Sequence, residues 1–298
     1  MKAKDIGILF LLAALWGASF LFMRIVSPVL GPFLTIELRV LIAGIVLLLY
    51  TAIIKHPSNF RERWRQYMVI GALNAAIPFT LIATATLTLN ASLAAVLNST
   101  TPLFAALVAW GWLKEKLTAR KIFGVMIGVS GVVILLGWSP IPLSFQVILS
   151  ASLSILAAVS YAFAGVYAKR TFTGVDSLSI AIGQQMAAAL LLLPITLTKI
   201  PSVHVSGMVV FAVIGLAVLC TAIAYLLYFY LIESVGPTKT LSVTFLIPLF
   251  GVIWGIVFLK EQVTTGMIIG LLIILSSVFM ISEINVKSML PTENKSVR

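Results

Sequence analysis

Charged residues are what this 298-residue sequence has least of. Asp, Glu, Lys and Arg make up 10% of it, whereas an ordinary soluble domain carries about 25%. Hydrophobic residues make up 61%, and the mean hydropathy is +1.14. This composition excludes an ordinary soluble fold and predicts a polytopic membrane protein. The net charge of +11 does not indicate nucleic acid as a partner, because the basic residues occupy short segments between apolar runs.

Side chains that carry chemistry are equally scarce. Cys220 is the single cysteine, which excludes an intrachain disulfide. The two histidines, His56 and His204, lie in separate connecting segments, and the motifs HExxH, GxSxG and GxxxxGK(S/T) are absent. We therefore expect no enzymatic activity, no metal site and no bound cofactor.

Long apolar runs dominate what is present. A bilayer core of about 30 Å requires roughly 20 apolar residues per helix, and this length predicts an all-α integral membrane protein with ten transmembrane helices. The first run lacks the A-x-A cleavage site of a signal peptide, so we expect it to be retained. The predicted spans are 6–26, 34–54, 67–86, 92–113, 122–137, 146–168, 178–198, 207–232, 238–259 and 267–284.

The sequence also repeats itself. The segment 101–118, TPLFAALVAWGWLKEKLT, returns 146 positions later at 247–264 as IPLFGVIWGIVFLKEQVT. Extended to residues 132 and 278, the two copies are identical at 12 of 32 positions. One period contains five spans, and an odd number places the second copy upside down in the membrane. We predict two inverted five-helix repeats, at 1–138 and 146–285, with a linker at 139–145 and a tail at 286–298.

Lys and Arg predict the orientation of the chain. The N-terminus, the even-numbered loops and the tail hold 16 of the 20 basic residues. Because cytoplasmic loops retain basic residues, we expect a multi-pass protein of the cytoplasmic membrane with both termini in the cytoplasm. Inverted repeats are a recurrent construction of secondary transporters, since two similar bundles of opposite orientation support inward-open and outward-open states.

Two helix faces related by the repeat are candidates for a transport pathway. Asn98 and Pro102 share one face of the fourth span, and Thr244 and Pro248 share the matching face of the ninth. A proline within a helix frees the carbonyl four residues before it, here that of Asn98 or Thr244. We expect these faces to bind substrate; the alternative is that the prolines only bend the helices for packing.

The third span repeats this arrangement with Asn74 and Pro78. Large aromatic side chains occur at related depths in three other spans, and they can stack on a substrate or close one end of a path. Ordinary packing or anchoring at the membrane interface is the alternative interpretation. These aromatic residues are Trp16 in the first span, Tyr161 at the matching point of the sixth, and Tyr225 and Tyr228 in the eighth.

Few charges fall inside the predicted spans. Glu37 and Arg39 begin the second span, and Arg24 ends the first. A pair between Glu37 and Arg24 across the short loop is expected, because residues two apart on a helix point in different directions. A structural role near the interface is favoured for these charges, and Glu37 is the candidate for proton coupling in the first half.

Two further pairs are related by the repeat. Glu115 and Glu261 follow lysines at the ends of spans and are expected to pair locally or to cap neighbouring backbone. Gly124 with Gly128 and Gly266 with Gly270 form faces of small residues, which predict close helix contacts, either between the two halves or between two subunits. The chain is accordingly expected to be a monomer or a homodimer in contact with lipid.

Four segments carry a resemblance to a known family. They are LWGASFLFMR at 15–24, IELRVLIAGIVLLL at 36–49, and the two TPLF/IPLF…LKE segments that end at Glu115 and Glu261. With them the chain resembles the EamA-like ten-helix permeases of the drug/metabolite transporter superfamily, over nearly its whole length.

The resemblance implies a basket-like fold with a central cavity bounded by spans one, three, four, six, eight and nine. It also implies a secondary transporter that exports amino acids, other small metabolites or toxic compounds, driven by the proton gradient. Aromatic-amino-acid exporters of the superfamily have cavities rich in Trp and Tyr, whereas spans three and four here offer mainly Ala, Thr and Asn. A smaller polar or zwitterionic substrate is therefore favoured, with an importer of the same fold, or more remotely a membrane scaffold or receptor, as the alternative.

Overall fold

The computed structural model describes residues 1–55, 60–139, 141–198 and 205–281, which are almost entirely helical and include no strand. Eight helical segments in this part of the chain are long and apolar enough to cross a membrane, and two more are apolar helices of 17 residues. The prediction of an all-α membrane protein with ten spans is confirmed. The predicted tail at 286–298 and the end of the tenth span lie outside the described residues.

The first five spans are built from seven α-helices and one π-helical segment, η2. A short 3-10 turn, η1 (Arg61–Arg63), lies between the second and third spans. The five spans are α1 (Ala3–Leu30), α2 (Pro32–Ile53), α3 (Trp64–Gly71) continued by η2 (Ala72–Ala76) and α4 (Ile77–Ala85), α5 (Ala91–Asn98) followed by α6 (Thr101–Leu113), and α7 (Ala119–Gly137).

The last five spans follow a similar plan, with a longer π-helical segment, η3, in the eighth. They are α8 (Phe145–Thr171), α9 (Ser177–Leu197), α10 (Gly207–Ile214) continued by η3 (Gly215–Ile223) and α11 (Ala224–Val235), α12 (Pro237–Thr240) followed by α13 (Val243–Leu259), and α14 (Thr265–Ile281).

The fourth and ninth spans are interrupted at different places. The fourth breaks at Ser99 and Thr100, directly before the proline-containing first turn of α6. The ninth breaks earlier, at Leu241 and Ser242, and α13 then continues through Pro248. A proline in the first turn of a helix leaves no hydrogen bond unmade, whereas one inside a helix does. The two prolines that the repeat aligns therefore act differently.

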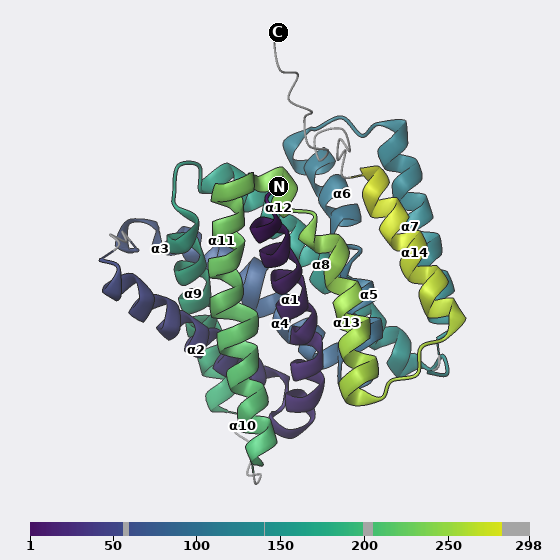
Figure 1. Ribbon diagram of the computed structural model, residues 1–298, viewed down its shortest axis with the longest axis horizontal. Coiled ribbons are helices and arrows are strands. Elements are labelled where there is room, and N and C mark those ends of the chain that lie inside the picture. Colours follow the sequence, from purple (N-terminus) through teal and green to yellow (C-terminus); the bar gives the residue numbers. More distant parts are fainter. Residues whose placement is uncertain (56–59, 140, 199–204, 282–298) are drawn as a thin grey trace.

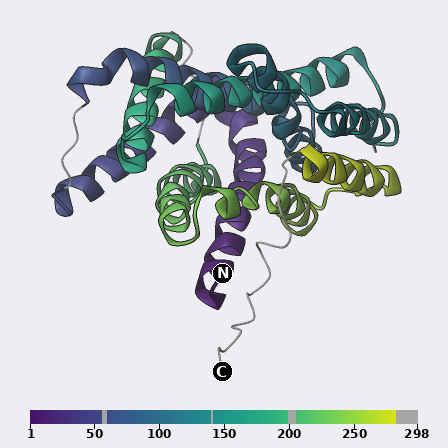
Figure 2. The ribbon, with the colours of Figure 1, turned by 90° about the horizontal axis from the view of Figure 1, so that it is seen from above.

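The main helix pairings join the first half of the chain to the second. Helix α7 packs along α14, α2 along α9, α1 along α13, and α8 against α4 and α6. Figure 1 shows α1 between α11 and α13 near the middle of the bundle, with the α7–α14 pair at one edge. Figure 2 shows the same bundle from above, with the helices in two layers and α1 crossing between them.

Glycines explain how closely α7 and α14 approach. A Cβ added at Gly270 would lie 2.8 Å from Cβ of Leu135 and 3.0 Å from the carbonyl oxygen of Gly131. Gly124 and Gly128 likewise face Ile281 and Ser277 of α14. The small-residue faces on these two helices thus join the two halves of one chain, which the sequence had left open.

The two LKE segments have the same local structure. Lys114 and Lys260 end α6 and α13 in the left-handed conformation, with φ of 58° and 55°. The next N–H, of Glu115 or Glu261, returns to the carbonyl six residues earlier, that of Ala109 or Gly255. Left-handed conformations are unfavourable for a non-glycine residue, so their occurrence at aligned positions indicates that the two copies fold alike here.

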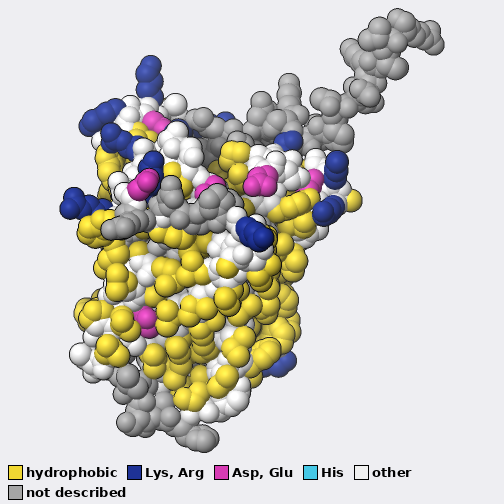
Figure 3. All heavy atoms as spheres, turned by 90° about the vertical axis from the view of Figure 1, so that its left-hand side faces the viewer, with side chains coloured by type: hydrophobic (Ala, Val, Ile, Leu, Met, Phe, Trp, Pro, Cys, Tyr) yellow, Lys and Arg dark blue, Asp and Glu magenta, His cyan; other side chains and the backbone are white. Residues whose placement is uncertain are grey.

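The surface in Figure 3 separates charge from hydrophobic side chains. Most Lys and Arg side chains on this face lie at the upper end, which is the end where α1 begins and α12 lies in Figure 1, and a broad hydrophobic area covers the face below. Exposed apolar residues on this scale are stable only against lipid. We call the end that carries these charges the basic end.

Replacing Gly270 with Ala should destabilise the protein by about 1–3 kcal/mol, because the new methyl group meets Leu135 and backbone that cannot move away freely. The measurement is the thermal unfolding midpoint of the purified protein in detergent. Gly137→Ala is the matched control, since a Cβ at Gly137 meets nothing within 4 Å. Equal midpoints for the two variants would contradict the close α7–α14 contact.

Candidate functional site

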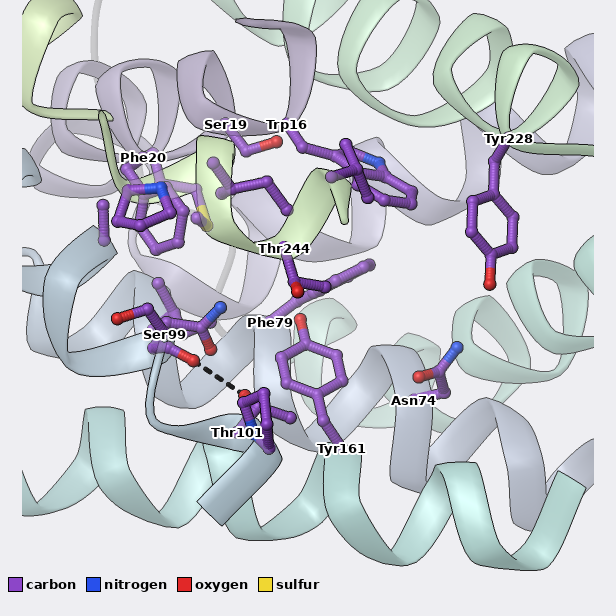
Figure 4. A pocket seen from close by; sticks show the side chains of 18 of the residues that line it. Trp16, Ser19, Phe20, Asn74, Phe79, Ser99, Thr101, Tyr161, Tyr228 and Thr244 are labelled. Carbon is purple, nitrogen blue, oxygen red and sulfur yellow. Dashed lines mark hydrogen bonds between the residues drawn. The ribbon is translucent and has the colours of Figure 1, made fainter. Parts of the chain in front are cut away.

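A cavity of about 320 Å³ lies inside the bundle, within the size range of small-molecule sites. Nine of the ten residues predicted to bind substrate line it. Figure 4 shows Trp16 and Tyr228 pointing into the space from one side and Tyr161 and Asn74 from the other. The nine are Trp16, Asn74, Asn98, Pro102, Tyr161, Tyr225, Tyr228, Thr244 and Pro248. Pro78 is buried in α4 and is not part of the lining.

The break in the fourth span sets the shape of the cavity wall. Asn98, Ser99, Thr101 and Pro102 all line the cavity at this point. The carbonyl of Asn98, the last residue of α5, has no partner within that helix and accepts a hydrogen bond of 2.7 Å from the Thr101 hydroxyl. This bond uses one of the two lone pairs of the carbonyl oxygen, so the expectation that the carbonyl is offered to substrate stays a prediction.

Aromatic rings form a second wall. The ring of Trp16 lies 5.4 Å from that of Tyr228 and 6.3 Å from that of Tyr225. Across the cavity, Tyr161 packs edge-on against Phe79 with ring centroids 6.2 Å apart. The predicted aromatic residues from α1, α8 and α11 thus come together, and they leave a largely apolar surface with hydroxyl groups at a few points.

A buried amide links two cavity-lining residues. Asn74 donates to Oε1 of Gln184 at 2.8 Å, and Nε2 of Gln184 donates to the Tyr225 hydroxyl at 2.7 Å. Asn74 lies in π-helical segment η2, and such segments occur frequently at functional sites. Gln184 was not predicted; its signal in the sequence is a glutamine pair inside an otherwise apolar span.

The cavity is closed at one end and open at the other. Met23 and Ile82, at the end away from α12, are 1% and 2% exposed. Leu241, between α12 and α13, is 51% exposed and also lines the cavity. The cavity lining is therefore buried at the end away from α12 and exposed at the basic end.

Glu261 holds the closed end together. Its carboxylate accepts from the backbone N–H groups of Ala91 at 2.7 Å and Ser92 at 3.0 Å, and from the Ser92 hydroxyl at 2.5 Å. A carboxylate at a helix N-terminus satisfies donors that have no partner within the helix. The expectation that Glu261 caps neighbouring backbone is confirmed, and the backbone is that of α5, 169 and 170 residues away in sequence.

Glu115, its counterpart in the repeat, behaves differently. Its Oε1 lies 3.1 Å from Nζ of Lys169 at the end of α8, and both side chains are largely exposed to solvent. An exposed pair of this kind contributes little to stability. Glu261 contacts the first residues of α5, whereas Glu115 follows the end of α6. Of the two, only Glu261 caps a helix.

The charges of the second span differ from the prediction. Arg24 donates to the carbonyl oxygens of Thr86 and Leu87, and the described residues contain no ion pair between it and Glu37. Glu37 is 4% exposed, its Oε2 has no hydrogen-bond partner among the described residues, and it does not line the cavity. Arg39 does line the cavity, so the second span bounds it as well as the six spans that the resemblance implies.

Ten apolar spans around a cavity that is open at one end are the architecture of a membrane transport protein. Comparison with protein families agrees. The model of the EamA-like transporter family matches residues 5–137 and again 148–283. This chain belongs to the EamA-like transporter family and is a multi-pass membrane transporter.

Individual relatives cover most of the chain. It is 26% identical over 284 residues to the uncharacterized transporter YvbV of Bacillus subtilis, covering 94% of this chain and 92% of that one. It is 28% identical over 263 residues to the uncharacterized inner membrane transporter YedA of Escherichia coli K12, covering 84% and 81%. A solved crystal structure, 19% identical and covering 94% and 96%, superposes with a TM-score of 0.67 and shares the fold.

Replacing Gln184 with Leu should lower the free energy of unfolding by about 1–3 kcal/mol, because the Asn74 amide and the Tyr225 hydroxyl lose their shared partner. Thermal unfolding in detergent measures this. Gln185→Leu is the matched control at the next position: its amide atoms are buried without a partner among the described residues, so its removal should leave the midpoint unchanged or raised. An equal loss in both variants would show that the network contributes nothing.

Proposed function

We propose that the protein is a secondary transporter that exports small polar metabolites of amino-acid-like chemistry, or toxic compounds, by alternating access. The observation that carries this proposal is the cavity, which is closed at the Glu261 end and open at the basic end. A carrier loads its cargo on the side to which its central site is open.

The positive-inside rule identifies the open end. Cytoplasmic loops of membrane proteins are rich in Lys and Arg, and these residues gather where the cavity opens. The N-terminus lies at the same end. We therefore assign the basic end to the cytoplasm. An exporter loads its substrate from the cytoplasm, so the conformation of this structure corresponds to its loading state. The cytoplasmic membrane is the proposed location.

Alternating access requires a second state in which the closed and open ends exchange. The 146-residue repeat aligns Ala91 and Ser92, which Glu261 caps, with Pro237 and Thr238 at the start of α12. The same relation aligns Glu261 with Glu115. In the outward-open state, we infer, Glu261 leaves α5 and Glu115 leaves Lys169 to cap α12, which closes the cytoplasmic end.

The two closures differ in strength for a chemical reason. Pro237 has no backbone N–H, so the start of α12 offers Glu115 one donor fewer than the start of α5 offers Glu261. Charge-assisted hydrogen bonds of this kind contribute about 1.5–3 kcal/mol each. The difference favours the conformation that is closed at the Glu261 end, in agreement with the structure.

Proton coupling is the proposed source of energy, and Glu37 is the residue proposed to exchange the proton. It is a buried carboxyl group within a span, without a hydrogen-bond partner for Oε2 among the described residues. Ionisable groups in such positions are expensive in lipid and mark ion pathways. Its place outside the cavity lining means that proton and substrate occupy separate sites.

Reconstitution into liposomes tests the transport proposal. A ligand is first found by thermal stabilisation with amino acids, nucleosides, sugars and cationic drugs, and its radiolabelled form is then followed in counterflow. Counterflow without a pH gradient, and net flux with one, are expected. Asn98→Ala and Thr244→Ala should weaken both binding and flux. Glu37→Gln should retain counterflow and lose the acceleration by the pH gradient.

Each outcome decides a different part of the proposal. Binding without counterflow would contradict transport, and unchanged pH dependence in Glu37→Gln would remove that residue from proton coupling. Flux that accumulates substrate on the side of the basic end would identify an importer of the same fold instead.

Neutralising the two glutamates should shift the conformational equilibrium in opposite directions. A cysteine in place of Ser19, a buried cavity residue, is introduced after Cys220→Ala and labelled from the Glu261 side with a membrane-impermeant maleimide. Glu261→Gln should raise the labelling rate about tenfold or more, because its charge-assisted bonds to α5 are weakened. Glu115→Gln should lower it.

Glu62→Gln controls for loss of a negative charge as such, because this carboxylate is exposed and has no hydrogen bond or ion pair with the described residues. It should leave the rate unchanged. Labelling that changes in the same direction for Glu261→Gln and Glu115→Gln would contradict the reciprocal closure.

A further inference from the structure

Arg39 is a buried cation that faces the cavity. It is 4% exposed, and it is one of the residues that form the lining. It lies seven residues after the start of α2, about 10 Å along the helix axis. At this depth an arginine does not reach the membrane interface as easily as one in the first turn, so its charge needs a partner inside the protein.

The contacts of Arg39 fix its plane without neutralising its charge. Nε donates to the Thr221 hydroxyl at 3.0 Å, and Nη1 lies 3.8 Å from the sulfur of Met23. The guanidinium carbon lies 3.6 Å from the centre of the Phe79 ring. Thr221 in turn donates to the carbonyl of Leu216 within η3. The group is therefore held rigidly, and most of its five N–H donors remain available.

No carboxylate among the described residues compensates this charge. The ionisable groups that act on Arg39 electrostatically are Tyr161, Cys220 and Tyr225. Phenols and thiols of ordinary acidity are neutral at pH 7. Glu37, two residues earlier on the same helix, makes no ion pair with it. An uncompensated buried charge costs several kcal/mol, so its retention beside a cavity points to a ligand that supplies the opposite charge.

We propose that Arg39 forms a subsite for a single carboxylate group of the transported compound, at the closed end of the cavity. This inference deepens the proposed transport function and rests on it. A planar guanidinium matches a carboxylate through two parallel hydrogen bonds. One cation in a cavity of about 320 Å³ balances one negative charge. The rings of Trp16, Tyr161 and Tyr228 bound the remaining space and suit an uncharged or cationic part of the same molecule.

The test compares ligands that differ only in this group. Thermal unfolding of the purified full-length protein is measured with amino acids and 2-hydroxy acids, and with the amide of each, which keeps the shape and loses the carboxylate charge. At least one of the acids should raise the unfolding midpoint. Its amide should bind about 10- to 100-fold more weakly, the loss expected for hydrogen bonds to a charged group.

Variants assign the effect to this residue. Arg39→Gln should bind acid and amide equally, and Arg39→Lys should give an intermediate preference, since it keeps the charge and loses the planar fork. Arg24→Gln is the control, because that guanidinium lies outside the cavity lining and contacts only backbone carbonyls; its preference for the acid should be unchanged. If Arg39→Gln does not fold, the comparison of acids with amides on the natural protein and on Arg39→Lys still decides.

Three results would overturn the subsite. They are stabilisation of the natural protein by none of the acids, equal affinity for acid and amide, and a preference for the acid that survives in Arg39→Gln. Counterflow in liposomes separates this inference from the transport proposal. Counterflow of a ligand without an anionic group would support transport and contradict the subsite. Arg39-dependent binding of an acid without counterflow would support the subsite and contradict transport.

Discussion

The absence of water in the hydrocarbon core is the constraint on which this structure depends. A polar group between the spans has no solvent to bind, so it must find a partner within the protein or remain unpaired at a cost of several kcal/mol. Most polar groups inside the bundle have such partners. In the part of the chain that the structure describes, nine buried side-chain atoms have no hydrogen-bond partner, among them Oδ1 of Asn98 and Oε2 of Glu37.

Backbone irregularities illustrate how completely this constraint is met. The spans depart from regular α-helix at η2, at η3 and at the break before α6, and each departure would leave carbonyls without N–H partners. Hydroxyl groups bind them: Ser160 donates to Leu73, Thr221 to Leu216, and Thr101 to Asn98. The spans can therefore depart from regular helix at these points without leaving the three carbonyls unpaired.

Periodicity and composition predicted the spans and most of the cavity. Lipid imposes length and hydrophobicity on every span, so both are visible in the sequence, and the repeat then picks out Asn98, Thr244 and their neighbours. The place of Arg39 in the cavity lining and the contacts of Gln184 were missed for a physical reason. Arg39 faces the cavity, and Gln184 faces Asn74 and Tyr225, because of the rotation of α2 and α9 about their axes, which packing against distant helices sets. Nothing local in the sequence encodes it.

The differences between the two halves carry as much information as their similarity. A perfectly symmetric pair of inverted repeats would make the inward-open and outward-open states equal in energy and would line the cavity with matching groups. Here Asn74 is matched by Cys220, Arg39 by Gln185, and Ala91 by Pro237. The first of these differences places an amide in the cavity lining from one half alone, and the second does the same for a cation. In the proposed carboxylate subsite, that cation would give an asymmetric molecule one direction of binding. In the proposed cycle, the third difference would weaken one closure relative to the other. In the transport cycle proposed above, duplication would supply the two states, and the departures from it would set the balance between them and the orientation of the cargo.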